Sequence, residues 1–177
     1  GVPAGFNYDI TYTVYGDQAL GVDLHVSCFD DLPPLPRIGL TLRLPQGFET
    51  FTWLGRGPEE SYCDRKSGVP IGNYQATVDE QYVPYILPQE HGNKTDVRWA
   101  AVCNEEGYGL LVSSEPLMEV SASHYPAEDL YQAMHTHELT RRPEVTLNLD
   151  IAQSGLGGAS CGPGTLDKYL VWPGEFK

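Results

Sequence analysis

One stretch near the middle of the chain concentrates side chains that can do acid–base or binding chemistry: YVPYILPQEHGNKTDVRW, Tyr82–Trp99. Glu90, His91 and Arg98 place a carboxylate, an imidazole and a guanidinium within nine residues. Two prolines fix their own φ and favour extended backbone before them, so we expect a stiff loop that leads into a strand. These polar side chains either line a polar pocket or form a structural plug that satisfies otherwise unpaired backbone groups.

A second candidate is the pair of histidines in HTHEL, His135 and His137. In an extended segment, side chains two residues apart project from the same face, and such a pair can supply two nitrogens to a metal ion. No third ligand is evident from the sequence, and two structurally bonded imidazoles are the alternative. We therefore assign no metal site to this chain.

Glu59 and Glu60 are the most obvious paired carboxylates. Glycosidases need two carboxyl groups that face each other across roughly 5–10 Å, whereas adjacent residues point in different directions. The preceding Gly55–Gly57 pair is followed at once by Pro58, which does not fit a dinucleotide-binding fingerprint. We assign no catalytic residue to this chain.

Glycines dominate the segment QSGLGGASCGPG, residues 153–164. Such a composition excludes a packed helix and leaves backbone amides open to a ligand. A phosphate-binding loop would also need a Lys-Ser/Thr pair and a following helix, and both are missing. The segment is a surface loop close to a binding event, or a flexible connection.

The composition describes a globular chain that forms one domain. Of its 177 residues, 41% are hydrophobic and 20% are charged, which is ordinary for a domain with one core. The formal charge of −13, with only 11 Lys and Arg, argues against nucleic acid or an anionic membrane as a partner. There is no membrane-spanning apolar run and no secretory signal at the amino end. The four cysteines lack metal or redox spacing, and we expect free thiols.

The elements that must position these residues are strands. Alternating patterns predict an antiparallel hairpin over 8–14 and 22–28, and a second hairpin over 96–103 and 108–113. Further strands are predicted over 38–44, at Phe51 and Trp53, and over 117–123, 145–151 and 168–172. Trp53 is expected in the core. One helix of about two turns is predicted after Pro126. The fold class is all-β, with at most one short helix.

Five blocks of this sequence resemble the carboxy-terminal, or small-chain, domain of the multidomain β-galactosidases of glycoside hydrolase family 2. They follow the order of the family and cover nearly the whole chain: PRIGLTLRLP (36–45), WLGRGPEESYCDR (53–65), YVPYILPQEHGNKTDVRW (82–99), HTHEL (135–139) and GLGGASCGP (155–163). The resemblance implies a β-supersandwich of the galactose-mutarotase-like superfamily, in agreement with the all-β pattern.

For chemistry, the resemblance implies a supporting role in hydrolysis of terminal β-D-galactosides such as lactose. The acid/base and nucleophile glutamates of the retaining mechanism lie in a central barrel absent from this chain. The Mg²⁺ and Na⁺ ions of such enzymes are also bound elsewhere, so we expect no cofactor in this chain. The matching loop implies a rim to the galactoside pocket, with Gly158, Ser160, Cys161 and Gly162 as substrate-binding residues. Some family members carry a tryptophan at the loop tip; here Ser160 or Cys161 would replace that stacking contact.

The resemblance also implies partners. We expect residues 1–177 to form a single β-sandwich domain, a fragment truncated at both ends of the family's carboxy-terminal domain. Its partners would be the catalytic barrel and other domains of the parent enzyme, the galactoside and, through an exposed apolar edge, another copy. We expect a cytoplasmic parent, with a periplasmic or secreted one as the alternative.

Two other functions stay open. A stand-alone carbohydrate-binding or aldose mutarotase-like domain would use Glu90 or another carboxylate as base and His135 or His137 as acid. A purely structural or oligomer-forming sandwich would use none of these groups.

Overall fold

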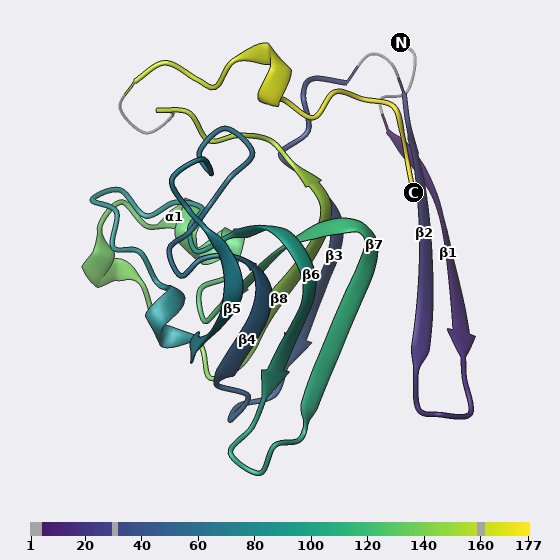
Figure 1. Cartoon of the computed structure of the whole chain (residues 1–177). Helices are drawn as coiled ribbons and strands as arrows, with labels where there is room; N and C mark the ends of the chain where they lie inside the picture. Colours follow the sequence, from purple (N-terminus) through teal and green to yellow (C-terminus); the bar gives the residue numbers. More distant parts are fainter. Residues whose placement is uncertain (1–4, 30–31, 159–161) are drawn as a thin grey trace.

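The computed structural model describes residues 5–29, 32–158 and 162–177, which form two antiparallel sheets (Figure 1). The smaller sheet has the strand order β1-β2-β9, and the larger has the order β3-β8-β7-β6-β4-β5. The strands are β1 (Phe6–Val14), β2 (Leu20–Cys28), β3 (Arg37–Leu44), β4 (Thr50–Arg56), β5 (Ile71–Thr77), β6 (Lys94–Cys103), β7 (Gly109–Ser123), β8 (Val145–Gln153) and β9 (Glu175–Phe176). The predicted all-β sandwich is confirmed.

Helical structure is confined to short segments among the described residues. The predicted helix is α1 (Ala127–Gln132), which begins after Pro126 and carries Glu128 and Asp129 in its first turn, where the helix dipole favours acidic groups. The 3₁₀ turns are η1 (Asp79–Gln81), η2 (Thr136–Glu138) and η3 (Asp167–Tyr169). None of the helices in the described part of the chain is long and apolar enough to cross a membrane.

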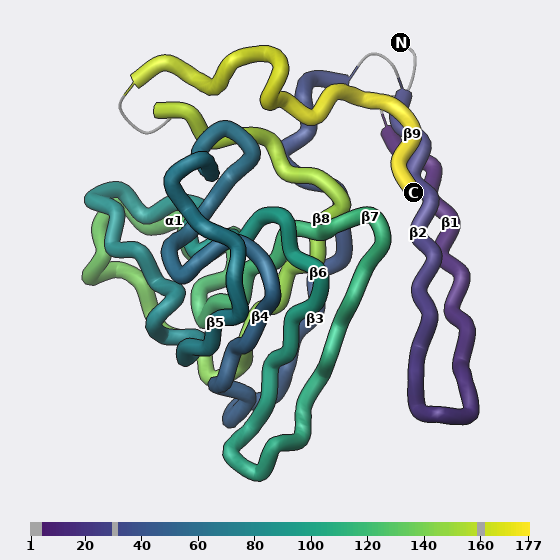
Figure 2. The backbone as a smooth tube through the Cα atoms, in the orientation of Figure 1, coloured from purple at the N-terminus to yellow at the C-terminus, as the bar shows by residue number. Residues whose placement is uncertain are grey.

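The first predicted hairpin is confirmed as β1 and β2, which pair in continuous register from Phe6 opposite Cys28 to Val14 opposite Leu20. Figure 2 shows the hairpin beside the body of the molecule, with its turn at the lower end of this view. A small apolar cluster of Val26, Cys28, Leu35 and Ile38 joins its base to β3.

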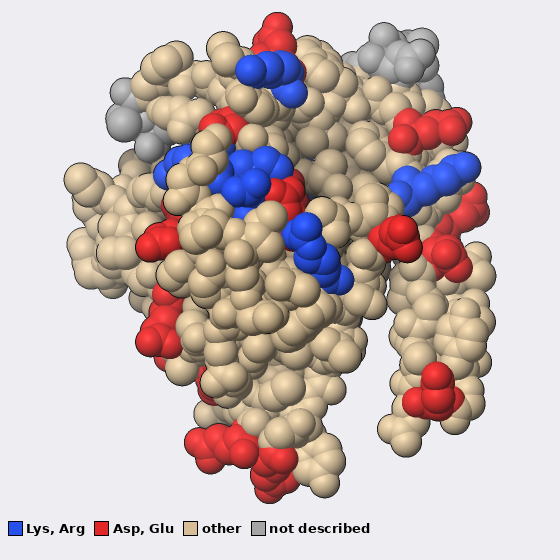
Figure 3. All heavy atoms as spheres, in the orientation of Figure 1, with Lys and Arg blue, Asp and Glu red and all other residues tan. Residues whose placement is uncertain are grey.

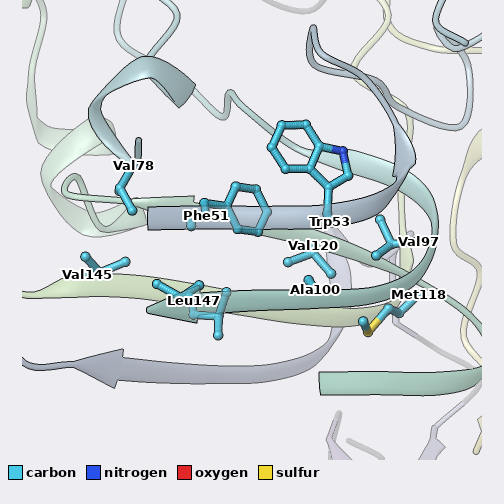
Figure 4. Packing of buried hydrophobic residues seen from close by; sticks show 11 residues of the cluster. Phe51, Trp53, Val78, Val97, Ala100, Met118, Val120, Val145 and Leu147 are labelled. Carbon is cyan, nitrogen blue, oxygen red and sulfur yellow. The ribbon is translucent and has the colours of Figure 1, made fainter. Parts of the chain in front are cut away.

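The main core is formed largely by apolar side chains of the six-stranded sheet. Residues of β4 alternate between buried and half-buried, and Phe51 and Trp53 are fully buried with their rings stacked at a centroid distance of 4.7 Å. Figure 4 shows these two side chains along β4, with Val120, Ala100 and other apolar residues of neighbouring strands beside them. Trp53 is therefore a core residue, as predicted, and offers no face to a ligand.

Two predicted strands, 108–113 and 117–123, are one long strand, β7. It pairs with β6 from Gly109, opposite Cys103, to Val120, opposite Lys94, and its second half also pairs with β8. Pro116 lies where the β6 register is irregular, between the pairs Trp99–Ser113 and Val97–Met118. A proline lacks a ladder donor and is tolerated at such an irregularity, so it does not end the strand.

The predicted strand over 168–172 is wrong. Tyr169 closes the 3₁₀ turn η3 by donating to the Leu166 carbonyl at 2.8 Å. Only Val171 forms a bridge, to Leu35. The Tyr169 carbonyl accepts from the Gly155 N–H at 2.8 Å, so this segment packs against the glycine-rich loop rather than extending a sheet.

Candidate functional site

Glu60 joins the loops that gather at one end of the large sheet. Its Oε2 accepts the Gly92 N–H at 2.8 Å, and its Oε1 accepts the Tyr85 hydroxyl and the Arg65 guanidinium. The carboxylate thus binds the 57–65 loop to the Tyr82–Gly92 loop, and the side chain is only 10% exposed. In the sequence, only its position next to Glu59 distinguishes this glutamate.

Behind Glu60, the same two loops interlock through fully buried polar groups. The Asn93 amide donates to the Ser61 carbonyl at 3.1 Å and to Glu119 Oε2 at 2.6 Å. Ser61 Oγ accepts the Thr95 N–H at 3.0 Å. Lys94 donates to the Pro58 carbonyl at 2.8 Å, and burial lowers its pKa to about 8. This half of Tyr82–Trp99 has the features of the structural plug.

Within the same segment, Tyr82–Trp99, residues Glu90 and His91 border a pocket. Glu90 and His91 line a cavity of about 150 Å³ together with residues of β3, β7 and β8, Tyr125 and the start of α1. His91 is 5% exposed; its Nδ1 lies 2.9 Å from the Gln89 carbonyl. Its Nε2 has no hydrogen-bond partner among the described residues. Glu90 forms an ion pair with Arg37 at 3.3 Å.

The floor of this pocket is a polar face of three neighbouring strands. Strand register aligns Thr41 with Asn148 and Asn148 with Ser121. Thr41 Oγ1 donates to Asn148 Oδ1 at 2.9 Å, and Asn148 Nδ2 donates to Ser121 Oγ at 3.0 Å. The pocket therefore offers both donors and acceptors, which suits a small polar ligand.

Two acids meet next to this floor. Glu119 on β7 lies opposite Asp150 on β8, and burial raises the pKa of each carboxyl group to about 7. The Arg37 guanidinium lies 3.2 Å from Asp150 and lowers the pKa of Asp150. The loss of solvation on burial raises this pKa by more than Arg37 lowers it. Sequence reasoning missed both residues, because each occupies a polar position of an alternating strand and nothing local signals that loops cover that face.

Arg98, His135 and His137 do not join Glu90 at the pocket lining. Arg98 donates to the Asp96 carbonyl at 2.6 Å. Asp96 in turn bonds Arg56 and Lys66, at 2.5 and 2.8 Å. Both histidines are exposed on and beside η2. The catalytic pairing of Glu90 with either histidine therefore has no geometric support.

The glycine-rich loop is fixed at its base by Asp64. Asp64 Oδ2 accepts the Gly157 N–H at 2.7 Å and the Thr165 hydroxyl at 2.8 Å. Gly158 donates to the Pro163 carbonyl at 3.0 Å, which closes the base. Gly158 and Gly162 belong to the described loop, whereas Ser160 and Cys161 lie outside the described residues. Sequence reasoning missed Asp64, although it lies in one of the family-like blocks.

An open depression adjoins this anchor, lined by Asp64, Arg65, Lys66 and their neighbours. On the face in Figure 3, basic side chains gather in the upper part of the body beside acidic ones. Arg56 and Lys66 form ion pairs with Asp96, and Arg65 forms one with Glu60. These three positive groups are thus already paired with carboxylates.

Two groups of side chains in the described part of the chain bring three potential metal ligands together: His135, His137 and Glu138, and Glu49, Asp79 and His124. Neither fits Mg²⁺ or Na⁺, which prefer oxygen ligands. The first set is rich in imidazole, and the second is already occupied by the Arg141 guanidinium, which bonds Asp79 at 2.8 Å. Cys28, Cys63 and Cys103 are free thiols, as expected for those three.

The fold and this site define an all-β sandwich protein whose loops build a polar end on one sheet. Residues 2–177 match the family model for the β-galactosidase small chain. The chain is 38% identical to a β-galactosidase of Priestia megaterium over 84% of its length, and 42% identical to one of Vibrio cholerae over 83%. A β-galactosidase of Actinobacillus pleuropneumoniae is 31% identical over 96%. The chain therefore belongs to the β-galactosidase small-chain family.

The chain spans only a small part of these relatives. It covers 14% of the length of the first two and 16% of the third. Most of the length of each relative therefore lies outside the matched region.

Proposed function

We propose that this chain is the supporting wall of the galactoside site in a β-galactosidase, and that it does not cleave the glycosidic bond by itself. Family membership supports a glycosidase parent. The observation that carries the proposal is the Asp64 anchor, which holds both ends of the 155–165 loop. A loop fixed at its base presents backbone amides at a defined place, as a substrate wall requires.

In this proposal the bond-cleaving carboxylates belong to another part of the parent. A retaining glycosidase needs two carboxyl groups about 5–5.5 Å apart, one as acid/base and one as nucleophile. The carboxylates of the loop end are engaged instead in structural bonds, Glu60 with backbone and Asp96 with two cations. The Mg²⁺ and Na⁺ ions of the parent would likewise be bound elsewhere, and its compartment would be the cytoplasm.

The test compares the full parent enzyme with a variant that lacks the loop from Gly155 to Gly164. We expect deletion to raise KM for lactose and for chromogenic galactosides, since one wall of the site is lost. Unaltered kinetics after deletion would instead favour a purely structural or oligomer-forming role.

The pocket at Glu90 and His91 favours one alternative, a carbohydrate-binding domain. The paired donors and acceptors of Thr41, Asn148 and Ser121 suit the hydroxyl groups of a sugar. Titration of the chain with D-galactose, followed by NMR, decides it: saturable shifts that an Asn148→Leu variant loses would support the alternative. Absence of shifts would leave the supporting wall as the function of this chain.

A further inference from the structure

The turn η2 brings the side chains of His135, His137 and Glu138 together, whereas an extended segment would separate Glu138 from the two histidines. One ligand atom each of His135, His137 and Glu138 lies within 4.8 Å of the others. His135 Nδ1 lies 2.8 Å from Glu138 Oε1, and the two imidazole rings are stacked with centroids 5.4 Å apart. All three residues are exposed to solvent.

Backbone conformation explains why this third ligand is not evident from the sequence. In an extended segment His135 and His137 share a face while Glu138 points away from them. In a 3₁₀ turn, which has three residues per turn, positions i and i+3 eclipse instead. Residues 136–138 form such a turn, so Glu138 returns to the side of His135.

The carboxylate is also held in place. Glu138 Oε2 accepts the Met134 N–H at 2.8 Å, which leaves Oε1 directed at His135. Metal-ligating carboxylates are commonly oriented by hydrogen bonds of this kind.

We propose that His135, His137 and Glu138 form a surface site for a divalent first-row transition ion, of which Zn²⁺ is the representative. Two imidazoles and one carboxylate are the donor set of such ions, whereas Mg²⁺ and Ca²⁺ take oxygen ligands. In a tetrahedral zinc site with bonds of about 2.1 Å, ligand atoms are about 3.4 Å apart. Exposed side chains reach that spacing by rotation, and water completes the coordination.

The second group of three potential ligands, Glu49, Asp79 and His124, differs from the group at η2 because it already contacts a cationic side chain. At Glu49, Asp79 and His124, the Arg141 guanidinium already lies among the ligands and bonds both carboxylates. A cation therefore occupies that position. No Lys or Arg ion pair involves His135 or Glu138 among the described residues, and the net charge of −13 favours uptake of a cation.

The experiment titrates the full 177-residue chain with ZnCl₂, followed by calorimetry and by the imidazole signals in NMR. We expect one-to-one binding that shifts the His135 and His137 signals, and no response to Mg²⁺. Glu138→Gln should weaken Zn²⁺ binding at least about tenfold, and His137→Ala should abolish the shift of His135. Circular dichroism checks that each variant folds.

The matched control is Glu128→Gln, which makes the same change of charge at an exposed residue of the neighbouring helix α1. It should bind Zn²⁺ like the unaltered chain. Equal affinity of the Glu138→Gln and Glu128→Gln variants would overturn the proposal. So would Zn²⁺ binding that leaves both histidine signals unmoved, as expected if thiols held the ion, or an absence of binding up to about 1 mM.

Discussion

At the scale of single residues, charged side chains at the loop end of the large sheet hold the backbone of neighbouring segments in place. Asp64, Glu60 and Lys94 each bond backbone groups of another segment. Removing such a partner leaves a desolvated group without compensation, which costs more than an average hydrogen bond contributes.

Asp64→Ala removes the acceptor of the Gly157 N–H and the Thr165 hydroxyl. We expect a loss of about 1–3 kcal/mol in the free energy of unfolding, and faster proteolysis within residues 155–165. Urea denaturation and limited proteolysis measure these effects. Asp9→Ala, at an exposed position of β1, is the control and should change neither. A stable Asp64→Ala variant with an unchanged cleavage pattern would contradict the anchoring role.

Glu119 and Asp150 predict a specific pH dependence. Burial raises each pKa to about 7 in the folded chain, whereas an unfolded chain titrates near 4. The folded state therefore binds more protons between these values, and stability falls as pH rises from about 4 to about 7. Glu119→Gln mimics the protonated acid, so it should raise the free energy of unfolding by about 1 kcal/mol or more at pH 8 and hardly at pH 4. An equal gain at both pH values would refute this explanation.

At the scale of elements, a glycine with positive φ fixes the entry to β6. Gly92 has φ +76°, and a Cβ there would lie 2.7 Å from the Gln81 carbonyl oxygen. Gly107 in the β6–β7 turn has φ +84° and nothing within 4 Å of such a Cβ. The two positions share the conformational cost and differ in steric contact.

Gly92→Ala should therefore be more destabilising than Gly107→Ala. The φ penalty alone is about 1 kcal/mol, and the contact at Gly92 adds about 1–3 kcal/mol through displacement of the loop. Thermal and urea unfolding of both variants measure the difference. Equal stability of the two variants would contradict the close contact between Gly92 and the Gln81 carbonyl.

The elements also show how far sequence reasoning reaches. Clear alternation predicted β1, β2, β3, β4 and β8, because an apolar face on a strand leaves a period of two. It did not predict β5, whose residues IGNYQAT carry few apolar side chains, and it divided β7 at Pro116. The segment Tyr82–Trp99 contributes residues both to the structural plug and to the pocket. Asn93 and Glu90 look equally polar in the sequence, and only the tertiary structure shows that Asn93 belongs to the plug and Glu90 to the pocket.

At the scale of the whole molecule, the β1–β2 hairpin exposes large apolar side chains to solvent. Large apolar side chains are exposed along it, among them Tyr8 at 69% and Tyr12 at 62%. Exposed apolar strands favour association. Within a parent enzyme other domains would cover this face, and in the isolated chain a second copy would.

The isolated chain should therefore self-associate as its concentration rises. Tyr12→Lys places a charge on the exposed face of β1 and should shift the equilibrium toward monomer. Sedimentation velocity over a range of concentrations measures both. A monomeric chain at all concentrations, or association unaffected by Tyr12→Lys, would show that the hairpin is not the associating surface.

We propose that this chain of the β-galactosidase small-chain family shapes a galactoside site without breaking the glycosidic bond itself. The most direct measurement is hydrolysis of a chromogenic β-galactoside by the purified 177-residue chain, beside the full parent enzyme. We predict turnover by the parent and none above buffer by the chain at any concentration. Turnover that co-purifies with the chain and scales with its amount would contradict a purely supporting role.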